Sequence, residues 1–449
     1  MTPKPPSRLS RSDLTADALY ALLRTTFDKV PDTRVDPTIS MGDALMSAFA
    51  MFALKDPSLL AFDERRQDPN DNFRSMFGIE HVPCDTQMRS ILDPVDPVLL
   101  RRCFGDIFRR LQRDKVLESF TFFDGRYLIS LDGTKYFSTT SDTIHCPECT
   151  IQKDAGGSVT HRHKFLGAVL VHPDRREVIP LALEPIANGD GKQKNDCERN
   201  ATRRWLQSFR HDHPKLPVII VEDDLAANAP HLRDLQAAEA RYIISVKSGD
   251  HAALFLALTA REAEGKVSTL TTFDPVTEVL SHYRYHHGLP VNDSGHDSMV
   301  NVLEYWELPR KGKPGRRNEV HSFCWITDLP LTEETVYDVM RGGRARWKIE
   351  NETFNTLKTQ GYRLEHNYGH GAKHLSTVLA VLMMLAFLVD QCQQIGCPVF
   401  RVAWKSRGCK RGLWEVLRVA FQLFHFESMV AMLEWLARRR VRGERRDTS

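Results

Sequence analysis

A short, almost entirely apolar run at residues 217–221 (PVIIV) constrains the fold more than any other feature of the chain. Such a run is typical of a strand that is buried on both faces. A strand of that kind needs helices packed against the sheet that contains it. The run therefore predicts an α/β core.

The segments around this run show strand and helix patterns in a defined order. Strands are predicted where short apolar segments are separated by turns, and helices where apolar positions recur at helical spacing. The predicted order is strand, strand, strand, helix, strand, helix, strand, at residues 127–137, 163–172, 177–186, 196–211, 217–221, 229–240 and 242–246. This order predicts a mixed sheet with helices packed against it.

Changes of pattern divide the 449 residues into five parts. The first is helical, and the sequence leaves open whether it is a packing domain or contains a DNA-reading helix-turn-helix. The parts are a helical N-terminal domain at 1–120, the first part of the sheet core at 121–247, an aromatic-rich β insertion at 248–331, the remainder of the core with a long helix at 332–390, and C-terminal helices with a basic tail at 391–449.

Charge and hydropathy limit the partners of the chain. The 61 basic and 58 acidic residues nearly balance, so a nucleic-acid surface must be local, for example at the arginine-rich segments 310–317 and 438–446. The first residues lack the apolar region of a secretory signal. The purest apolar run, 378–389, is too short to span a bilayer. We therefore expect a cytoplasmic protein with no membrane partner.

Two aspartates occupy positions where a sheet commonly carries its chemistry. Asp132 lies inside a predicted strand, where burial of a carboxylate is costly unless something positive compensates it. Asp223 follows the apolar run between two other acids, Glu222 and Asp224, and a divalent cation is the simplest compensation for such a cluster. Either aspartate alone could instead begin a turn or cap a helix. If the two strands are neighbours, both aspartates can approach one point.

A third acid is offered by the predicted helix at 344–360. Glu350 lies four residues after Arg346 and four before Phe354, so these side chains share one helix face. Trp347 lies beside Glu350 at a spacing of three. The alternative is an exposed helix with ordinary ion pairs.

These residues together resemble the DDE transposases of bacterial insertion sequences, of the insertion-sequence-four-like type, which have a ribonuclease-H-like catalytic core. The resemblance rests on 131–134 (LDGT), 221–223 (VED) and 346–350 (RWKIE), and it covers roughly residues 127–387. It fits the predicted β insertion between the second aspartate and the glutamate. Two positions differ from the family pattern: Gly343 stands where the family has a tyrosine, and Lys358 follows the glutamate by eight residues instead of seven.

The resemblance implies that Asp132, Asp223 and Glu350 hold a pair of Mg²⁺ or Mn²⁺ ions for DNA strand cleavage and strand transfer. Asp224 and Glu352 remain alternative ligands. Asp223 is preferred because it directly continues the strand, and Glu350 because it keeps the family's spacing from the tryptophan.

The resemblance also implies contacts with double-stranded DNA, both at the terminal repeats of an element and at the target. Arg346 and Lys358 would contact phosphates near the scissile bond. Trp347 would stack on a displaced base, or else anchor the helix as a buried side chain. Two element ends must be brought together, so a homodimer on DNA is expected.

A candidate zinc site precedes and enters the second predicted strand. Cys146 and Cys149 form a C-x-x-C pair, and His161 and His163 are two residues apart, so both imidazoles would point the same way from a strand. The alternative is a pair of reduced cysteines in an ordered loop.

Two other functions stay open on the sequence. One is a metal-dependent nuclease that cuts DNA without joining it. The other is an inactive, transposase-derived DNA-binding protein that uses the N-terminal helices and the cysteine loop.

Overall fold

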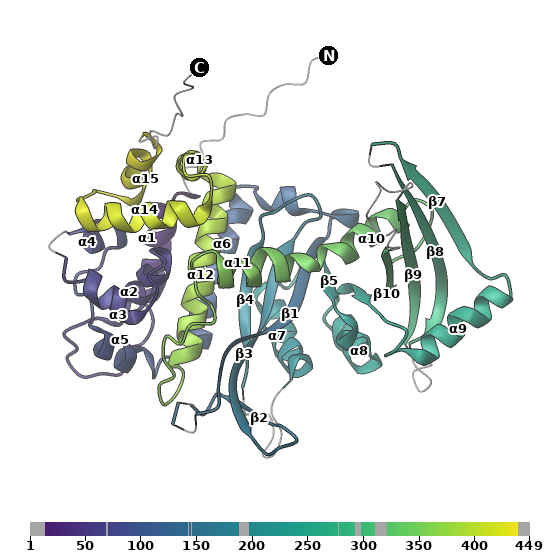
Figure 1. The fold of residues 1–449 in the computed structure, drawn as a ribbon, viewed down its shortest axis with the longest axis horizontal. Coiled ribbons are helices and arrows are strands. Elements are labelled where there is room, and N and C mark those ends of the chain that lie inside the picture. Colours follow the sequence, from purple (N-terminus) through teal and green to yellow (C-terminus); the bar gives the residue numbers. More distant parts are fainter. Residues whose placement is uncertain are drawn as a thin grey trace, which may run out of the picture.

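The computed structural model describes residues 14–68, 71–141, 143–144, 146–187, 197–276, 278–291, 298–309 and 321–438. One mixed, ten-stranded sheet crosses the molecule, and helices cover it and gather at one end (Figure 1). The predicted α/β class with a mixed sheet is confirmed. The predicted basic segment at 310–317 and all but Arg438 of the one at 438–446 lie outside the described residues.

The strands follow one another along the sheet in an order that departs from their order in the chain. Their bounds are β1 Tyr127–Thr139, β2 Thr150–Lys153, β3 Val159–Val171, β4 Ile179–Ile186, β5 Val218–Glu222, β6 Arg241–Ser245, β7 Ser268–Asp274, β8 Val279–Pro290, β9 Met299–Pro309 and β10 His321–Thr327. The spatial order is β2-β3-β1-β5-β6-β10-β9-β8-β7, and β4 also pairs with β3. Strands β1, β5 and β6 run parallel, and the other pairs are antiparallel. Every residue of β5 is buried, as its apolar run predicts.

Two helices of the sheet core lead into the parallel strands β5 and β6. Helix α7, Glu198–Asp212, joins β4 to β5, and α8, Ala229–Ala237, joins β5 to β6. The predicted strands and helices of this region occur in the predicted order, but the short strand β2 between the first two of them was not predicted. Parallel neighbours such as β5 and β6 require a crossover connection, because a tight turn would make the second strand antiparallel to the first.

The segment predicted as a β insertion extends the central sheet. It contains α9, Ala252–Ala263, followed by β7 to β10. Strand β10 pairs antiparallel with β6, so the strands of the insertion continue the sheet of the core. A row of aromatic rings crosses β8, β9 and β10 at centroid distances of 5.1, 6.3 and 5.5 Å, and consists of Tyr283, Tyr305, Phe323 and Trp325.

The first three N-terminal helices begin at serine or threonine caps. Ser40 and Ser58 accept backbone N–H groups at 3.0 and 3.1 Å, which satisfies donors that the first helical turn leaves free. The helices are α1 Ala16–Phe27, α2 Met41–Ala53, α3 Leu59–Arg65, α4 Asn72–Phe77, α5 Asp85–Leu92 and α6 Arg101–Arg113.

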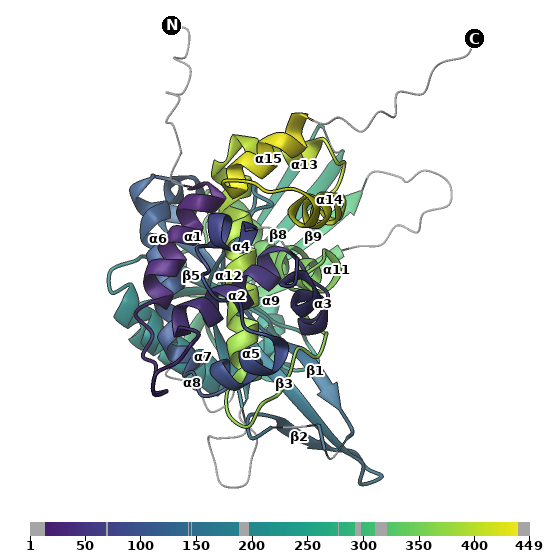
Figure 2. The same cartoon turned by 90° about the vertical axis from the view of Figure 1, so that its left-hand side faces the viewer.

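These helices pack against the C-terminal helices α13 Pro398–Lys405, α14 Lys410–Leu423 and α15 Met429–Arg438. The Asn72 amide donates to the carbonyls of Phe421 and Phe424, both at 2.7 Å. Asp17 accepts the N–H groups of Met429 and Val430 at 2.8 and 3.0 Å. The two ends of the described chain therefore form one helical body (Figure 2).

Helix α12, Leu375–Gly396, lies between this helical body and the sheet, where it contacts α2 and β4. It is long and apolar enough to cross a membrane by length and composition, and its most apolar window is entirely buried inside the protein. The helix extends well beyond the apolar run predicted at 378–389. Its apolar character on all sides is explained by neighbours on all sides.

Candidate active site

The register of two neighbouring strands brings the two predicted aspartates together. Strands β1 and β5 are parallel neighbours, as the prediction required, and Ser130 pairs with Val221. The same register carried two residues further places Asp132 opposite Asp223. Asp132 lies within β1, and Asp223 directly follows the last residue of β5.

Glu350 reaches the same place from a helical segment that crosses the sheet. It follows α10, Val336–Ala345, and lies in a π-helical turn, η6, Ile349–Phe354. The Ser130 hydroxyl donates to the carbonyl of Arg346 at 3.1 Å, which ties this segment to β1. Gly167, the partner of Asp132 on β3, allows the close approach, because a Cβ there would lie 2.9 Å from the Phe354 ring.

The π-helical turn accounts for the unusual spacing of Lys358. A π turn takes in about one residue more than an α-helical turn, so an interval of eight residues that includes one makes about two full turns. Lys358 lies in α11, Asn355–Thr359, directly after η6. From this geometry we expect Lys358 on the helix face of Glu350, as with a spacing of seven on a regular α-helix.

The other departure, Gly343, also has a packing reason. Gly343 lies on α10 against the indole of Trp325 in β10. A Cβ at this position would lie 2.5 Å from the Trp325 Nε1 atom, so no larger residue fits without a shift of the indole. The insertion thus fills the place that a tyrosine side chain would need.

One guanidinium group lies among the three acids. The Arg346 Nη1 atom lies 2.9 Å from Glu350 Oε1 and 3.8 Å from Asp132 Oδ2. Its charge also acts to lower the pKa of Asp223. Arg346 is only 11% exposed, so it is placed among the carboxylates rather than on an open surface. The structure therefore brings together the three acids that the sequence singled out.

The arrangement is rich in negative charge. Burial raises the pKa of Asp132 to about 7, against the attraction of Arg346 and with further increases from Glu350 and Asp223. Burial likewise raises the pKa of Asp223. One guanidinium therefore leaves an excess of negative charge at a partly open site, where Glu350 is 39% exposed. Carboxylate oxygens in such a place are the ligands that hard divalent cations take, so the residues fit Mg²⁺ or Mn²⁺.

The neighbouring acids of Asp223 have cations of their own. Glu222 contacts the buried His231 at 2.6 Å, and Asp224 contacts Lys247 at 3.1 Å. Asp223 instead accepts the N–H of Leu225 at 3.1 Å and so also caps a short 3-10 turn. The capping alternative is therefore correct as far as it goes, and Asp223 rather than Asp224 faces Asp132.

Glu352, the alternative to Glu350, acts on a different set of side chains. Burial lowers the pKa of Lys348 and of Lys410, and the charge of Glu352 acts against that shift, whereas the charge of Glu350 acts on Asp132. Glu350 is thus the acid that the helical segment presents to the two aspartates.

A fourth carboxylate, Glu198, was not predicted. It lies in the first turn of α7, and its side chain packs against Gly133, where a Cβ would approach its Cδ atom to 2.3 Å. Burial raises the pKa of Glu198, and the charge of Asp223 raises it further. An acid in the first turn of a helix is common, because it faces the positive end of the helix dipole. The sequence therefore contained no signal that separated Glu198 from ordinary first-turn acids.

Among the predicted DNA contacts, Trp347 is accessible. Its side chain is 49% exposed, with the Arg346 guanidinium 5.2 Å from the ring centroid. The alternative of a buried tryptophan anchor is wrong. Phe354 is the buried anchor instead, and its ring lies 6.0 Å from that of Phe165 on β3.

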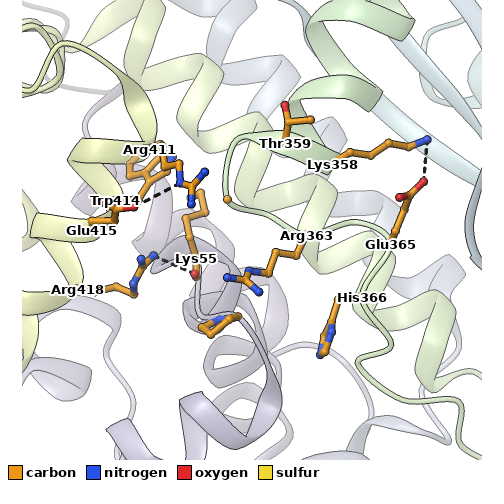
Figure 3. Close-up of a pocket in the computed structure, with 12 residues that line it drawn as sticks. Lys55, Lys358, Thr359, Arg363, Glu365, His366, Arg411, Trp414, Glu415 and Arg418 are labelled. Atoms are coloured by element: carbon orange, nitrogen blue, oxygen red, sulfur yellow. Dashed lines mark hydrogen bonds and ion pairs between the residues drawn. The ribbon is translucent and has the colours of Figure 1, made fainter.

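Lys358 lines a cavity of about 480 Å³ between α11, α14 and the loop after α2 (Figure 3). Cationic side chains outnumber acidic ones in its wall. They are Lys55, Lys358, Arg363, Arg411 and Arg418, with Glu365 and Glu415 opposing them. Lys55 is held by Asp390 at 2.7 Å, Lys358 by Glu365 at 3.1 Å and Arg411 by Glu415 at 3.4 Å, so Arg363 and Arg418 supply most of the excess positive charge.

The predicted zinc ligands are only partly brought together. Cys146, Cys149 and His163 form a buried group, and its fourth member is His370. His161 is buried but is not part of this group. It lies two residues further along β3, where it pairs with Ile151 of β2, and a strand moves about 3.3 Å per residue.

A second group of possible metal ligands lies in the insertion. Ligand atoms of Glu262, His286 and Glu304 all lie within 4.8 Å of one another, so the group could hold a metal ion. Arg284 already contacts Glu262 at 2.5 Å and Glu304 at 2.7 Å. A cation would therefore have to displace this guanidinium.

The chain matches no protein-family model, and no curated protein matches it.

Proposed function

We propose that this protein is a DNA transposase with a ribonuclease-H-like core, which cuts DNA at the ends of an insertion sequence and transfers the cut strands. The observation that carries the proposal is the convergence of Asp132, Asp223 and Glu350 around Arg346. The core supports it as well. Strands β4, β3 and β1 are antiparallel neighbours, and β1, β5 and β6 are parallel, which is the order expected of a ribonuclease-H-like sheet.

In this proposal the three carboxylates hold Mg²⁺ or Mn²⁺. Bound there, the ions would activate the attacking oxygen and stabilise the leaving one in an in-line phosphoryl transfer. Asp132 and Asp223 are fixed by adjacent strands, whereas Glu350 is more exposed and reaches the site from a helical segment. Arg346 offsets the mutual repulsion of the carboxylates and would contact a DNA phosphate that enters the site.

DNA would cross the site on the side of Trp347 and α11. Trp347 is exposed beside Arg346, which suits an aromatic ring that stacks on a base. The cationic cavity at Lys358 follows on the same helical segment and suits the DNA backbone. Because two element ends must be joined to one target, two copies of the chain would act together on double-stranded DNA.

The test is metal-dependent cleavage of duplex DNA taken from either side of the chain's own coding sequence. Asp132→Asn, Asp223→Asn and Glu350→Gln should each abolish cleavage and leave DNA binding intact. The matched controls are the neighbouring acids, Asp224→Asn and Glu352→Gln, which should retain cleavage. Binding is measured by mobility shift, and cleavage and joining by end-labelled products on a denaturing gel.

The products also distinguish the alternatives. Joined strands support a transposase, and cut strands without joining indicate a metal-dependent nuclease. Binding without cleavage by the unaltered chain, over a range of Mg²⁺ and Mn²⁺ concentrations, would indicate a DNA-binding protein that has lost activity. Cleavage by the Asp132→Asn variant at the normal rate would exclude the assigned site.

A further inference from the structure

Four buried side chains from three separate segments face one another beside β3. Cys146 and Cys149 lie in the connection from β1 to β2, His163 lies on β3, and His370 lies in the connection from α11 to α12. The Cys146 Sγ atom is 4.0 Å from Cys149 Sγ and 3.2 Å from His163 Nε2. His163 Nε2 is 3.1 Å from His370 Nδ1.

These distances match the edges of a tetrahedral site for zinc. With Zn–S bonds of about 2.3 Å and Zn–N bonds of about 2.0 Å, a tetrahedron has edges of about 3.8 Å between sulfurs, 3.5 Å between sulfur and nitrogen, and 3.3 Å between nitrogens. The observed 4.0, 3.2 and 3.1 Å each lie within about 0.3 Å of these values. The sulfur atoms are too far apart for a disulfide, which needs about 2.05 Å.

The chemistry of the donors selects the ion. Two thiolates and two imidazoles suit zinc, whereas Mg²⁺ and Ca²⁺ take oxygen ligands. All four side chains are buried, so no open position is left for a substrate, which is typical of a structural site. Without an ion, only weak hydrogen bonds between the thiols and imidazoles would hold these four side chains together.

The surrounding residues hold the donors in place. The backbone N–H of Cys149 donates to the carbonyl of Cys146 at 3.1 Å, which closes the turn that presents both sulfurs. The Phe137 ring lies edge-on to His370 at 4.4 Å. Between the cysteines, Glu148 contacts the His374 imidazole at 2.8 Å and accepts the Thr377 hydroxyl at 2.6 Å, at the start of α12.

We propose that Cys146, Cys149, His163 and His370 bind a structural Zn²⁺ ion that fastens the β1–β2–β3 region to the connection between α11 and α12. That connection begins just after the helical segment of Glu350 and ends at the buried helix α12. The ion would therefore fix the path of the chain between the candidate active site and the helical body. This inference concerns a site separate from the three acids and does not rest on their activity.

The first test is the zinc content of the full chain, purified without chelators and measured by elemental analysis. We expect about one zinc per chain, and His370→Ala and Cys149→Ser should each lose it. His161→Ala is the matched control, because it removes a buried histidine of the same strand that is outside the group, and it should retain zinc. Loss of zinc from His161→Ala with retention in His370→Ala would overturn the assignment.

The second test uses the unaltered chain, so it does not depend on whether the variants fold. Replacement of zinc by Co²⁺ should produce the intense visible bands of tetrahedral cobalt together with a sulfur-to-cobalt charge-transfer band in the near ultraviolet. X-ray absorption at the zinc edge should give two sulfur and two nitrogen neighbours. A folded chain that contains no zinc and takes up no cobalt would refute the proposal.

Discussion

Asp132 should destabilise the metal-free protein at neutral and alkaline pH, and Asp132→Asn should remove that effect. Burial raises the pKa of Asp132 from 3.8 to about 7, so the folded protein holds this proton over a pH range in which the unfolded chain has lost it. At pH below about 4 the carboxyl is neutral in both states, and its full contribution to stability is present. As pH rises through 7, that contribution is lost.

The magnitude follows from the width of this range. Each pH unit between 3.8 and about 7 corresponds to about 1.4 kcal/mol, so the total reaches about 4 kcal/mol as an upper value. The Asp132 side chain is 16% exposed, so water screens it little. Arg346 keeps Glu350 as a partner in the variant, so the substitution leaves no cation alone. We expect Asp132→Asn to be more stable by about 1–4 kcal/mol at pH 8 and nearly equal at pH 4.

The assay is urea unfolding in EDTA at a series of pH values from 4 to 9. The exposed Asp36→Asn variant is the control and should follow the unaltered chain at every pH. Added Mg²⁺ should then stabilise the unaltered chain and not Asp132→Asn, because an amide at position 132 binds the ion less well than the Asp132 carboxylate. A variant that is less stable than the unaltered chain at pH 8, or a difference that is the same at pH 4 and pH 8, would refute the reasoning.

Two further outcomes are expected. Glu198→Gln should move the acid limb of the pH dependence of cleavage to lower pH, because the Glu198 charge helps to raise the pKa of Asp132. The exposed Glu333→Gln is the control. An acid limb that does not move in Glu198→Gln would show that Glu198 acts elsewhere. Phe354→Ala should lose about 3–5 kcal/mol of stability in urea unfolding, whereas Trp347→Ala should lose less than about 1 kcal/mol, because the first is buried and the second half-exposed; equal losses would contradict these positions.

The sequence predicted the sheet core well because its signals are local. The apolar run of β5 is a feature of five consecutive residues, and the acid that follows it is fixed by covalent continuity. Once β1 and β5 are neighbours, the meeting of Asp132 and Asp223 needs no further information. The pairing of β1 with β5 is a tertiary property. The sequence alone did not predict it, so the meeting of the two aspartates was predicted only on the condition that these strands are neighbours.

The parts that were missed depend on contacts between distant residues. His370 is 207 positions from His163, and no local pattern distinguishes it from the other histidines. The prediction chose His161 because alternate residues of a strand share a face, but a shared face does not bring both to the same point along the strand. Glu198 was missed for a similar reason, since its neighbour Gly133 belongs to another element.

The pairing of the first and last described helices sets an order on synthesis of the protein. Asp17 receives its backbone partners from Met429 and Val430, more than four hundred residues later. A ribosome must therefore translate nearly the whole described chain before α1 and α4 complete their packing. Helix α1 contacts α2, α4 and α6 but also α15, and Phe73 of α4 lies against Phe421 of α14. Until then the apolar surface that faces α14 and α15 stays uncovered, and chaperones would have to shield it. A truncated translation product would be expected to aggregate rather than to act as a partial enzyme.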